Sequence, residues 1–246
     1  MTEPAGRRSL LTGGVGLLVG AGAGAAVGRA TAQTSPLDGL PRFPSPGEEL
    51  MTEHGVLKRV LLAYRAISTR LGKAERVPRE ALVDAAQIVA DYVESFHEGL
   101  EEAYVFPRVA AHAAYTGVVE TLLAQHDRGR HLTSEILVLA ASDSSRPSAR
   151  EPLRARLDAF VTMYEPHEAW EDTVIYPALR ALTPSRTLDE LAARFADLEA
   201  GRYSDLALAR ILERVEGVEQ QLGIGDLASF TAPSSLTFPL SGHSQT

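Results

Sequence analysis

One eleven-residue pattern occurs twice in this chain and limits the possible folds more than any other feature. HEGLEEAYVFP spans residues 97–107, and HEAWEDTVIYP spans residues 167–177. Both copies read His-Glu-x-x-Glu-acid and close on an aromatic residue and a proline. A further histidine precedes each copy, at His54 and His126. The repeat predicts a two-helix unit that is used twice and would build a site with two similar halves.

Apolar residues recur at helical spacing around both copies. Ser45-Pro46-Gly47-Glu48 has the pattern of a capping box with proline in the first turn, so a helix should begin there. We predict four helices, at about 46–72, 78–107, 116–141 and 149–177, with a loop at 142–147. Pro107 and Pro177 should interrupt the second helix and end the fourth. Helical spacing places Leu123 on the inward face of the third helix and Trp170 on the inward face of the fourth.

Four helices of similar length with short connections favour an all-α fold, an up-down-up-down antiparallel four-helix bundle over residues 46–182. A C-terminal helical extension should follow over 183–230, with helices at about 187–199 and 204–222. Its apolar stripe could pack on the bundle or form a dimer face; the stripe comprises Val215, Val218, Leu222 and Ile224. Residues 231–246 are expected to form a flexible tail.

The N-terminal region has the pattern of an export signal. Residues 1–32 join the pair Arg7-Arg8 to an uncharged, glycine-rich stretch and to Ala30-Thr31-Ala32, a typical cleavage sequence. The string is typical of twin-arginine signals, and residues 33–45 form a proline-rich linker. We therefore expect a protein exported to the periplasm, the cell envelope or the exterior. An uncleaved membrane anchor is the alternative, although the glycines disfavour it.

The repeated motifs place metal-binding side chains at fixed helical spacing. His97 with Glu101, and His167 with Glu171, are each one turn apart and lie side by side. His54 and His126 should reach the same level from the antiparallel helices. Burying six such groups in an apolar bundle is costly unless cations bind them, although each histidine alone could be an ordinary core residue.

The rest of the composition restricts the metal and the partners. The chain has no cysteine, so a metal must be held by nitrogen and oxygen, which suits iron or manganese. The formal net charge is −8 and no basic stripe is visible, so nucleic acid is not an expected partner. The remaining histidines are not expected to bind metal: His131 on the outer face, His112 near a helix end and His243 in the tail.

The doubled motif resembles the hemerythrin-like HHE cation-binding family over about residues 48–181. The stretch 194–230 is also similar to the C-terminal extension of bacterial members. The resemblance implies a pair of iron ions. Their ligands would be His54, His97, His126 and His167, with Glu101 and Glu171 bridging the two ions.

The sequence departs from the oxygen-carrying members of this family. These use a fifth histidine one turn after the third-helix histidine, where this chain has Arg130. Their last carboxylate would correspond to Asp172, whereas the repeated frame selects Glu171. Glu98 could be a seventh ligand, because some relatives bind iron through the residue after the histidine.

Three functions are compatible with such a site. The first is a protein that binds or senses dioxygen or a related small ligand, or handles iron. The second is a di-iron peroxidase or oxidase of the cell envelope. The third is a structural or interaction domain that a metal stabilises. With four histidines, two bridging glutamates and a bridging hydroxide, two positions remain for an added ligand. Tyr104 and Trp170 could donate electrons or simply pack in the core, and a homodimer is possible.

Overall fold

The computed structural model describes residues 44–141, 147–201, 204 and 207–232. Within these residues the regular structure is entirely helical, with no strand. The predicted export signal at 1–32, the linker up to residue 43, the loop at 142–146, His243 and residues 233–246 of the tail lie outside the described residues. None of the described helices is long and apolar enough to cross a membrane.

The first helix, α1, spans Pro46–Gly72 and begins at the predicted capping box. The Ser45 backbone N–H donates to Glu48 Oε2 at 2.9 Å, and the Glu48 N–H donates to Ser45 Oγ at 3.3 Å. Two further helices run without interruption in the ordinary α geometry: α5 over Thr116–Ala141 and α6 over Pro147–Trp170. The predicted bounds of the first and third helices are confirmed.

The second and fourth helical segments contain wide turns with i to i+5 hydrogen bonds. The second consists of α2 (Arg79–Ile88), η1 (Val89–His97), α3 (Glu98–Leu100), η2 (Glu101–Val105) and α4 (Phe106–Ala110). The fourth continues from α6 through η3 (Glu171–Ile175) into α7 (Tyr176–Leu182). Both segments therefore continue past Pro107 and Pro177, which the sequence placed as an interruption and an end.

The wide turns explain why the prolines do not break these helices. Proline has no N–H for the carbonyl four residues earlier, and its ring collides with that carbonyl in a regular α-helix. A wider turn moves this carbonyl away and keeps the chain helical. Because η2 and η3 immediately precede Phe106-Pro107 and Tyr176-Pro177, the duplicated motif produces the same local geometry twice.

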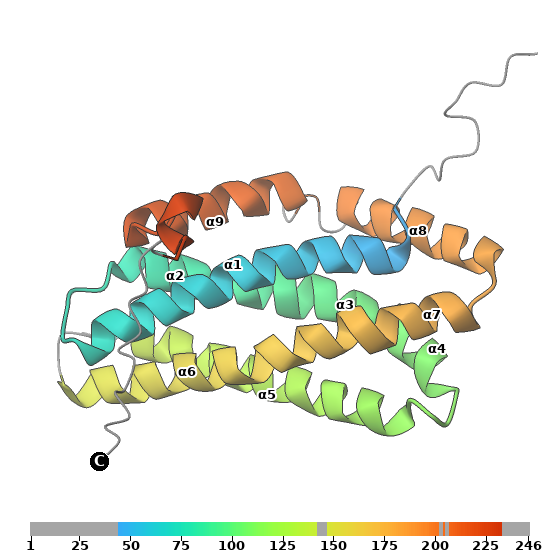
Figure 1. The fold of residues 1–246 in the computed structure, drawn as a ribbon, viewed down its shortest axis with the longest axis horizontal. Coiled ribbons are helices and arrows are strands. Elements are labelled where there is room, and N and C mark those ends of the chain that lie inside the picture. Colours follow the sequence, from blue (N-terminus) through green and yellow to red (C-terminus); the bar gives the residue numbers. More distant parts are fainter. Residues whose placement is uncertain (1–43, 142–146, 202–203, 205–206, 233–246) are drawn as a thin grey trace, which may run out of the picture. The chain divides into compact units, whose positions relative to one another are not determined.

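The long helices pack around a common apolar core (Figure 1). Helix α1 contacts α2 and α6, and α5 contacts α2 and α6, so each long segment has two neighbours. The largest fully buried side chains come from α1, from the second and fourth helical segments and from the C-terminal extension, and they include Tyr64, Tyr92, Phe96, Phe106, Phe160, Tyr164 and Phe195.

Two residues that the sequence placed inward lie at the surface. Leu123 is 40% exposed, whereas its neighbour Leu122 is buried. Trp170 is 52% exposed. Successive helical residues are rotated by about 100°, so Trp170 points well away from the neighbouring Glu171, which faces the centre.

The C-terminal extension packs on the outside of the long helices. Helix α8 spans Ser185–Ala200 and α9 spans Leu208–Leu222, followed by the short 3-10 turn η5 at Leu227–Phe230. Helix α9 lies on α1 and α2, where Val215, Val218 and Leu222 are buried. Arg59 also pairs with Glu219 at 2.6 Å. The apolar stripe of the extension therefore covers the bundle.

Gly129 of α5 provides a test of how closely the helices approach each other. A Cβ atom at this position would lie 2.0 Å from Tyr164 Oη, whereas one at Gly117 in the same helix would meet no atom within 4 Å. We expect Gly129→Ala to lower the free energy of unfolding by about 1–3 kcal/mol through overpacking. Gly117→Ala should be neutral or stabilising, since alanine favours helix.

Denaturant unfolding of both variants measures this difference. Adding Tyr164→Phe to Gly129→Ala should recover part of the loss, because the nearest colliding atom is the Tyr164 hydroxyl. Equal stability of the two alanine variants would contradict the packing described here.

Candidate metal centre

Four histidines and two glutamates from the long helices meet in the protein interior. His54 comes from α1, His126 from α5 and His167 from α6, while His97, Glu101 and Glu171 lie in or at the start of the wide turns. All six side chains are at most 3% exposed. Their ligand atoms form two groups, and within each group all of these atoms lie within 4.8 Å of one another. One group comprises His54, His97, Glu101 and Glu171, and the other comprises His126, His167 and Glu171.

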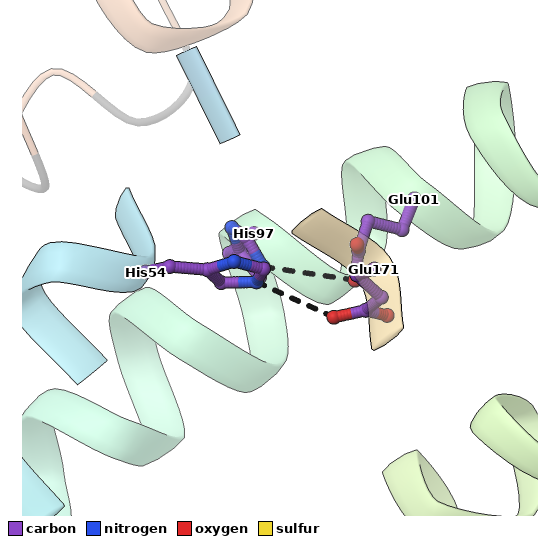
Figure 2. A group of neighbouring side chains, drawn as sticks. All are labelled: His54, His97, Glu101 and Glu171. Atoms are coloured by element: carbon purple, nitrogen blue, oxygen red, sulfur yellow. Dashed lines mark ion pairs between the residues drawn. The ribbon is translucent and has the colours of Figure 1, made fainter. Parts of the chain in front are cut away.

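Each glutamate lies between the two halves of the cluster. Glu171 Oε2 is 3.3 Å from His54 Nε2, and Glu171 Oε1 is 3.1 Å from His167 Nε2. Glu101 Oε2 is 3.7 Å from His97 Nε2 and 3.5 Å from His126 Nε2. Figure 2 shows the first half, in which His54 and His97 face the two carboxylates. Each carboxylate could therefore be shared by two cations.

The outer nitrogen of every histidine in the cluster is held by an oxygen atom. Nδ1 of His54 lies 2.7 Å from Asp172 Oδ1, and Nδ1 of His97 lies 2.8 Å from Glu53 Oε2. In the other half, Nδ1 of His126 is 3.0 Å from Glu102 Oε1, and Nδ1 of His167 is 2.9 Å from Gln125 Oε1. An Nδ1–H that donates outward leaves the Nε2 lone pair directed at the centre, as metal-binding histidines require.

These outer partners repeat with the motif and were not predicted from the sequence. Glu53 precedes His54 and contacts His97 of the next helical segment. In the same way, Gln125 precedes His126 and contacts His167 of the next helix. Glu102 and Asp172 each follow a central glutamate and hold the remaining two histidines. The sequence did contain a signal for these partners, because a polar residue lies directly beside each of His54, His126, Glu101 and Glu171.

A cation one turn after His54 and His126 also repeats. Lys58 Nζ pairs with Glu168 Oε1 at 2.6 Å, and Arg130 Nη2 pairs with Glu98 Oε2 at 2.8 Å. Arg130 thus occupies the position of the missing fifth histidine, and its charge is directed to an outer carboxylate.

One pair of equivalent residues makes the two halves different. The hydroxyl of Tyr176 donates to Glu101 Oε1 at 2.7 Å and lies 3.3 Å from His54 Nε2. Its counterpart in the other repeat is Phe106, whose ring stacks on His126 with centroids 5.4 Å apart. The His54 half therefore has a phenol that donates to a central glutamate, whereas the phenol beside His167, that of Tyr164, donates to Glu98. Sequence reasoning missed this role, although the Phe-Pro and Tyr-Pro endings differ visibly.

Burial and the neighbouring charged groups shift the pKa values of Glu101 and Glu171 in opposite directions. Burial, followed by the charge of Glu171, raises the pKa of Glu101 well above its usual range. Burial alone would also raise the pKa of Glu171, but contacts with His167 and His54 outweigh it and lower this pKa. Burial likewise opposes protonation of His54, yet the hydrogen bond to Asp172 and the nearby carboxylate of Glu171 raise its pKa to about 9. Burial lowers the pKa of His97 and of His126, which favours the neutral imidazole that a metal requires.

The donor set fits metal cations. His97 Nε2, Glu101 Oε2 and both oxygens of Glu171 are buried without a hydrogen-bond partner among the described residues. His126 Nε2 and His167 Nε2 face each other at 3.2 Å, although both outer nitrogens already have acceptors. Unpartnered buried lone pairs are destabilising, and a shared cation would satisfy them. We conclude that these residues could hold a metal.

The two additional ligand candidates lie outside the central cluster. Asp172 is on the outer nitrogen of His54, so the carboxylate directed at the centre is that of Glu171. Glu98 accepts hydrogen bonds from Tyr164 Oη at 2.7 Å and from Arg130. With Glu102 and His126 it forms a third possible cation group, but the Arg130 guanidinium already pairs with both carboxylates. The geometry thus favours supporting roles for Glu98 and Asp172.

The other singled-out residues are distant from this centre. His131 is exposed, as predicted for the outer face, and His112, which follows the end of α4 as predicted, is exposed as well. Tyr104 packs against Phe195 of α8, with ring centroids 5.7 Å apart, and its hydroxyl lies near Arg194. The structure thus gives Tyr104 a packing role against the extension.

Glu49, one turn before Glu53, gives the apoprotein a pH-dependent stability. Burial and the nearby charges of Glu53 and Glu199 raise the pKa of Glu49 from 4.5 to about 7. The folded state keeps this proton when the unfolded state has lost it, so rising pH favours unfolding. We expect the wild type to lose stability relative to Glu49→Gln as the pH rises from 4.5 through about 7. Urea unfolding of both proteins across this range measures the effect, and a pH-independent difference would contradict it.

Comparison with known proteins agrees with this centre. Residues 45–179 match the model of the hemerythrin HHE cation-binding domain. Uncharacterized proteins of Mycobacterium bovis and Mycobacterium tuberculosis are 38% identical to this chain over 240 residues, which cover 94% of this chain and 93% of theirs. No solved structure gives a significant match.

The matched region contains all four histidines and both glutamates of the central cluster. The buried, two-part donor set and the family model therefore describe the same segment. The chain belongs to the hemerythrin HHE cation-binding domain family.

Proposed function

We propose that the cluster binds two iron ions and that the protein binds dioxygen or a related small ligand, such as peroxide or nitric oxide. The observation that carries this proposal is the position of Glu101 and Glu171, each between a histidine of one half and a histidine of the other. Imidazole and carboxylate donors without thiolate suit iron, and manganese is the alternative metal.

The proposed framework is an antiparallel, up-and-down four-helix bundle over residues 46–182 with a C-terminal helical extension. The contacts of α1 and α5 with both α2 and α6 support it. In such a bundle, facing helices supply ligands from all sides to one internal level.

Small-ligand binding is supported by the absence of a fifth histidine. Arg130 points its guanidinium to Glu98 and Glu102 and supplies no metal ligand. Four histidines and two shared glutamates leave coordination positions of two six-coordinate ions open. When bound, an iron pair would supply reversible ligand binding and electron transfer, while this chain's residues orient the ligands and exclude water.

A second candidate function is a di-iron peroxidase or oxidase. The observation that favours it is Tyr176, because a phenol 2.7 Å from Glu101 and 3.3 Å from His54 could supply a proton to a reacting ligand. A stabilising metal in an interaction domain is the third possibility and predicts no ligand chemistry.

Metal analysis of protein purified from its own host, with absorption spectra under air and argon, tests the proposal. We expect about two irons per chain and a spectral change in air that argon reverses. Steady turnover of peroxide with an electron donor would instead support the enzyme. A chain that binds neither iron nor manganese would refute the proposal.

We also propose export by the twin-arginine route, supported by Arg7-Arg8 and the uncharged stretch after them. Replacing both arginines with lysine should keep the protein in the cytoplasm, as cell fractionation would show. A homodimer, if formed, would need another surface than Val215, Val218 and Leu222, which are buried against α1 and α2.

A further inference from the structure

A pocket of about 270 Å³ lies between α5 and α6. It reaches His167, one of the proposed ligands. The remaining lining residues come from the first turns of α5 and the end of α6, and they are Gly117, Val118, Thr121, Leu122, Gln125, Pro166 and Trp170. Pockets of this size accommodate a small ligand.

The lining specifies a neutral, planar ligand. None of the lining residues is an acid, a lysine or an arginine, so the pocket offers no partner for a charged group. Trp170 is 52% exposed and provides a large aromatic face at the surface. Aromatic rings stack favourably on such a face, and a volume of about 270 Å³ fits a single-ring ligand.

Gln125 provides one directional contact. Its Oε1 accepts from His167 Nδ1 at 2.9 Å, which fixes the orientation of the amide. The amide nitrogen then has no partner among the described residues and can donate to an oxygen of the ligand. A hydrogen-bonded path thus runs from the pocket through Gln125 to His167, whose Nε2 is 3.1 Å from Glu171.

The pocket adjoins the half of the cluster whose phenol, that of Tyr164, donates to Glu98 and not to a central glutamate. Tyr176 serves the His54 half, whereas Phe106 covers His126 and has no hydroxyl. An external reductant would therefore supply the half in which no phenol hydroxyl contacts a central glutamate.

We propose that this pocket binds a single-ring phenol or hydroquinone, which delivers electrons to the metal pair through Gln125 and His167. The inference rests on the proposed di-iron function. Oxidation of a hydroquinone breaks its two O–H bonds and releases two protons to water at the mouth of the pocket. Its two electrons reduce two Fe(III) ions to Fe(II), one each, and the ring leaves as the quinone.

Titration calorimetry of the iron-loaded full chain with resorcinol tests binding separately from electron transfer. Resorcinol has the size and hydroxyls of hydroquinone but cannot form a stable quinone. Trp170 is the only tryptophan in the sequence, so its emission should change as resorcinol binds. Hydroquinone, added under argon, should bind and also bleach the ferric absorption spectrum.

Gly117→Leu is the blocking variant, since a Cβ at this lining position has no atom within 4 Å and a longer side chain can fill the pocket. We expect association to weaken about tenfold or more, with iron content unchanged. Gly217→Leu on α9 is the matched control, because its Cβ is equally free and lies outside the pocket. It should bind like the wild type.

Each outcome decides the inference. Resorcinol that does not bind the wild type, or binds Gly117→Leu as tightly, overturns it. Iron-loaded protein without resorcinol binding overturns this inference and leaves the proposed function intact. A chain that binds resorcinol but no iron refutes the proposed function, and with it the electron delivery.

Discussion

Replacing Glu171 with glutamine is expected to abolish binding of the metal pair, whereas replacing its neighbour Asp172 with asparagine should only weaken it. Glu171 faces His54 with one oxygen and His167 with the other, so the amide would remove a charge shared by both halves. Among the described residues, Asp172 pairs with the outer nitrogen of His54 and with no atom at the centre. Loss of such an outer contact typically costs about 10–100-fold in metal affinity, and Glu171→Gln should cost more.

Iron titration of the two purified variants measures this difference, with bound iron determined by metal analysis. Glu165→Gln on α6 is a suitable control, because this exposed glutamate pairs only with Arg65 among the described residues. If Asp172→Asn lost the metal pair and Glu171→Gln retained it, the carboxylate shared by the ions would be Asp172 and the central geometry described here would be wrong.

Removing the metal should lower the thermal stability strongly. A ligand held at about 1,000 times its dissociation constant stabilises the folded state by about 4 kcal/mol. For a chain of this size that corresponds to a fall in Tm of about 8–16 °C when the metal is removed. The physical cause is the set of buried atoms at the centre, including His97 Nε2 and Glu101 Oε2, which then lack partners.

Calorimetry before and after treatment with a chelator measures the shift, and renewed addition of ferrous iron should restore it. Under the same conditions Glu171→Gln should show little further change, because it has no metal pair to lose. An unchanged Tm in the wild type would mean that metal binding is not coupled to folding.

The first and third helices could be predicted closely because their signals are local. The capping box at Ser45 and Glu48 depends on residues three apart, and the inward face of α1 follows from helical spacing. The spacing of His97 with Glu101 and of His167 with Glu171 is equally local. Pro107 and Pro177 misled the prediction because the sequence does not show that a wide turn can accommodate them.

The sequence by itself determined the class of the protein, which is a helical chain with a duplicated unit and six candidate ligands. The ligands could be found because they lie four residues apart within each motif or at matching positions before the two copies. Only the tertiary structure decided which oxygen faces which nitrogen. Asp172 rather than Glu171 holds the outer side of His54, Tyr176 reaches Glu101 from another helix, and Trp170 lies at the surface. These contacts depend on how far each helix is rotated and displaced against its neighbours. Packing across the whole core sets those rotations, and no short stretch of sequence records them.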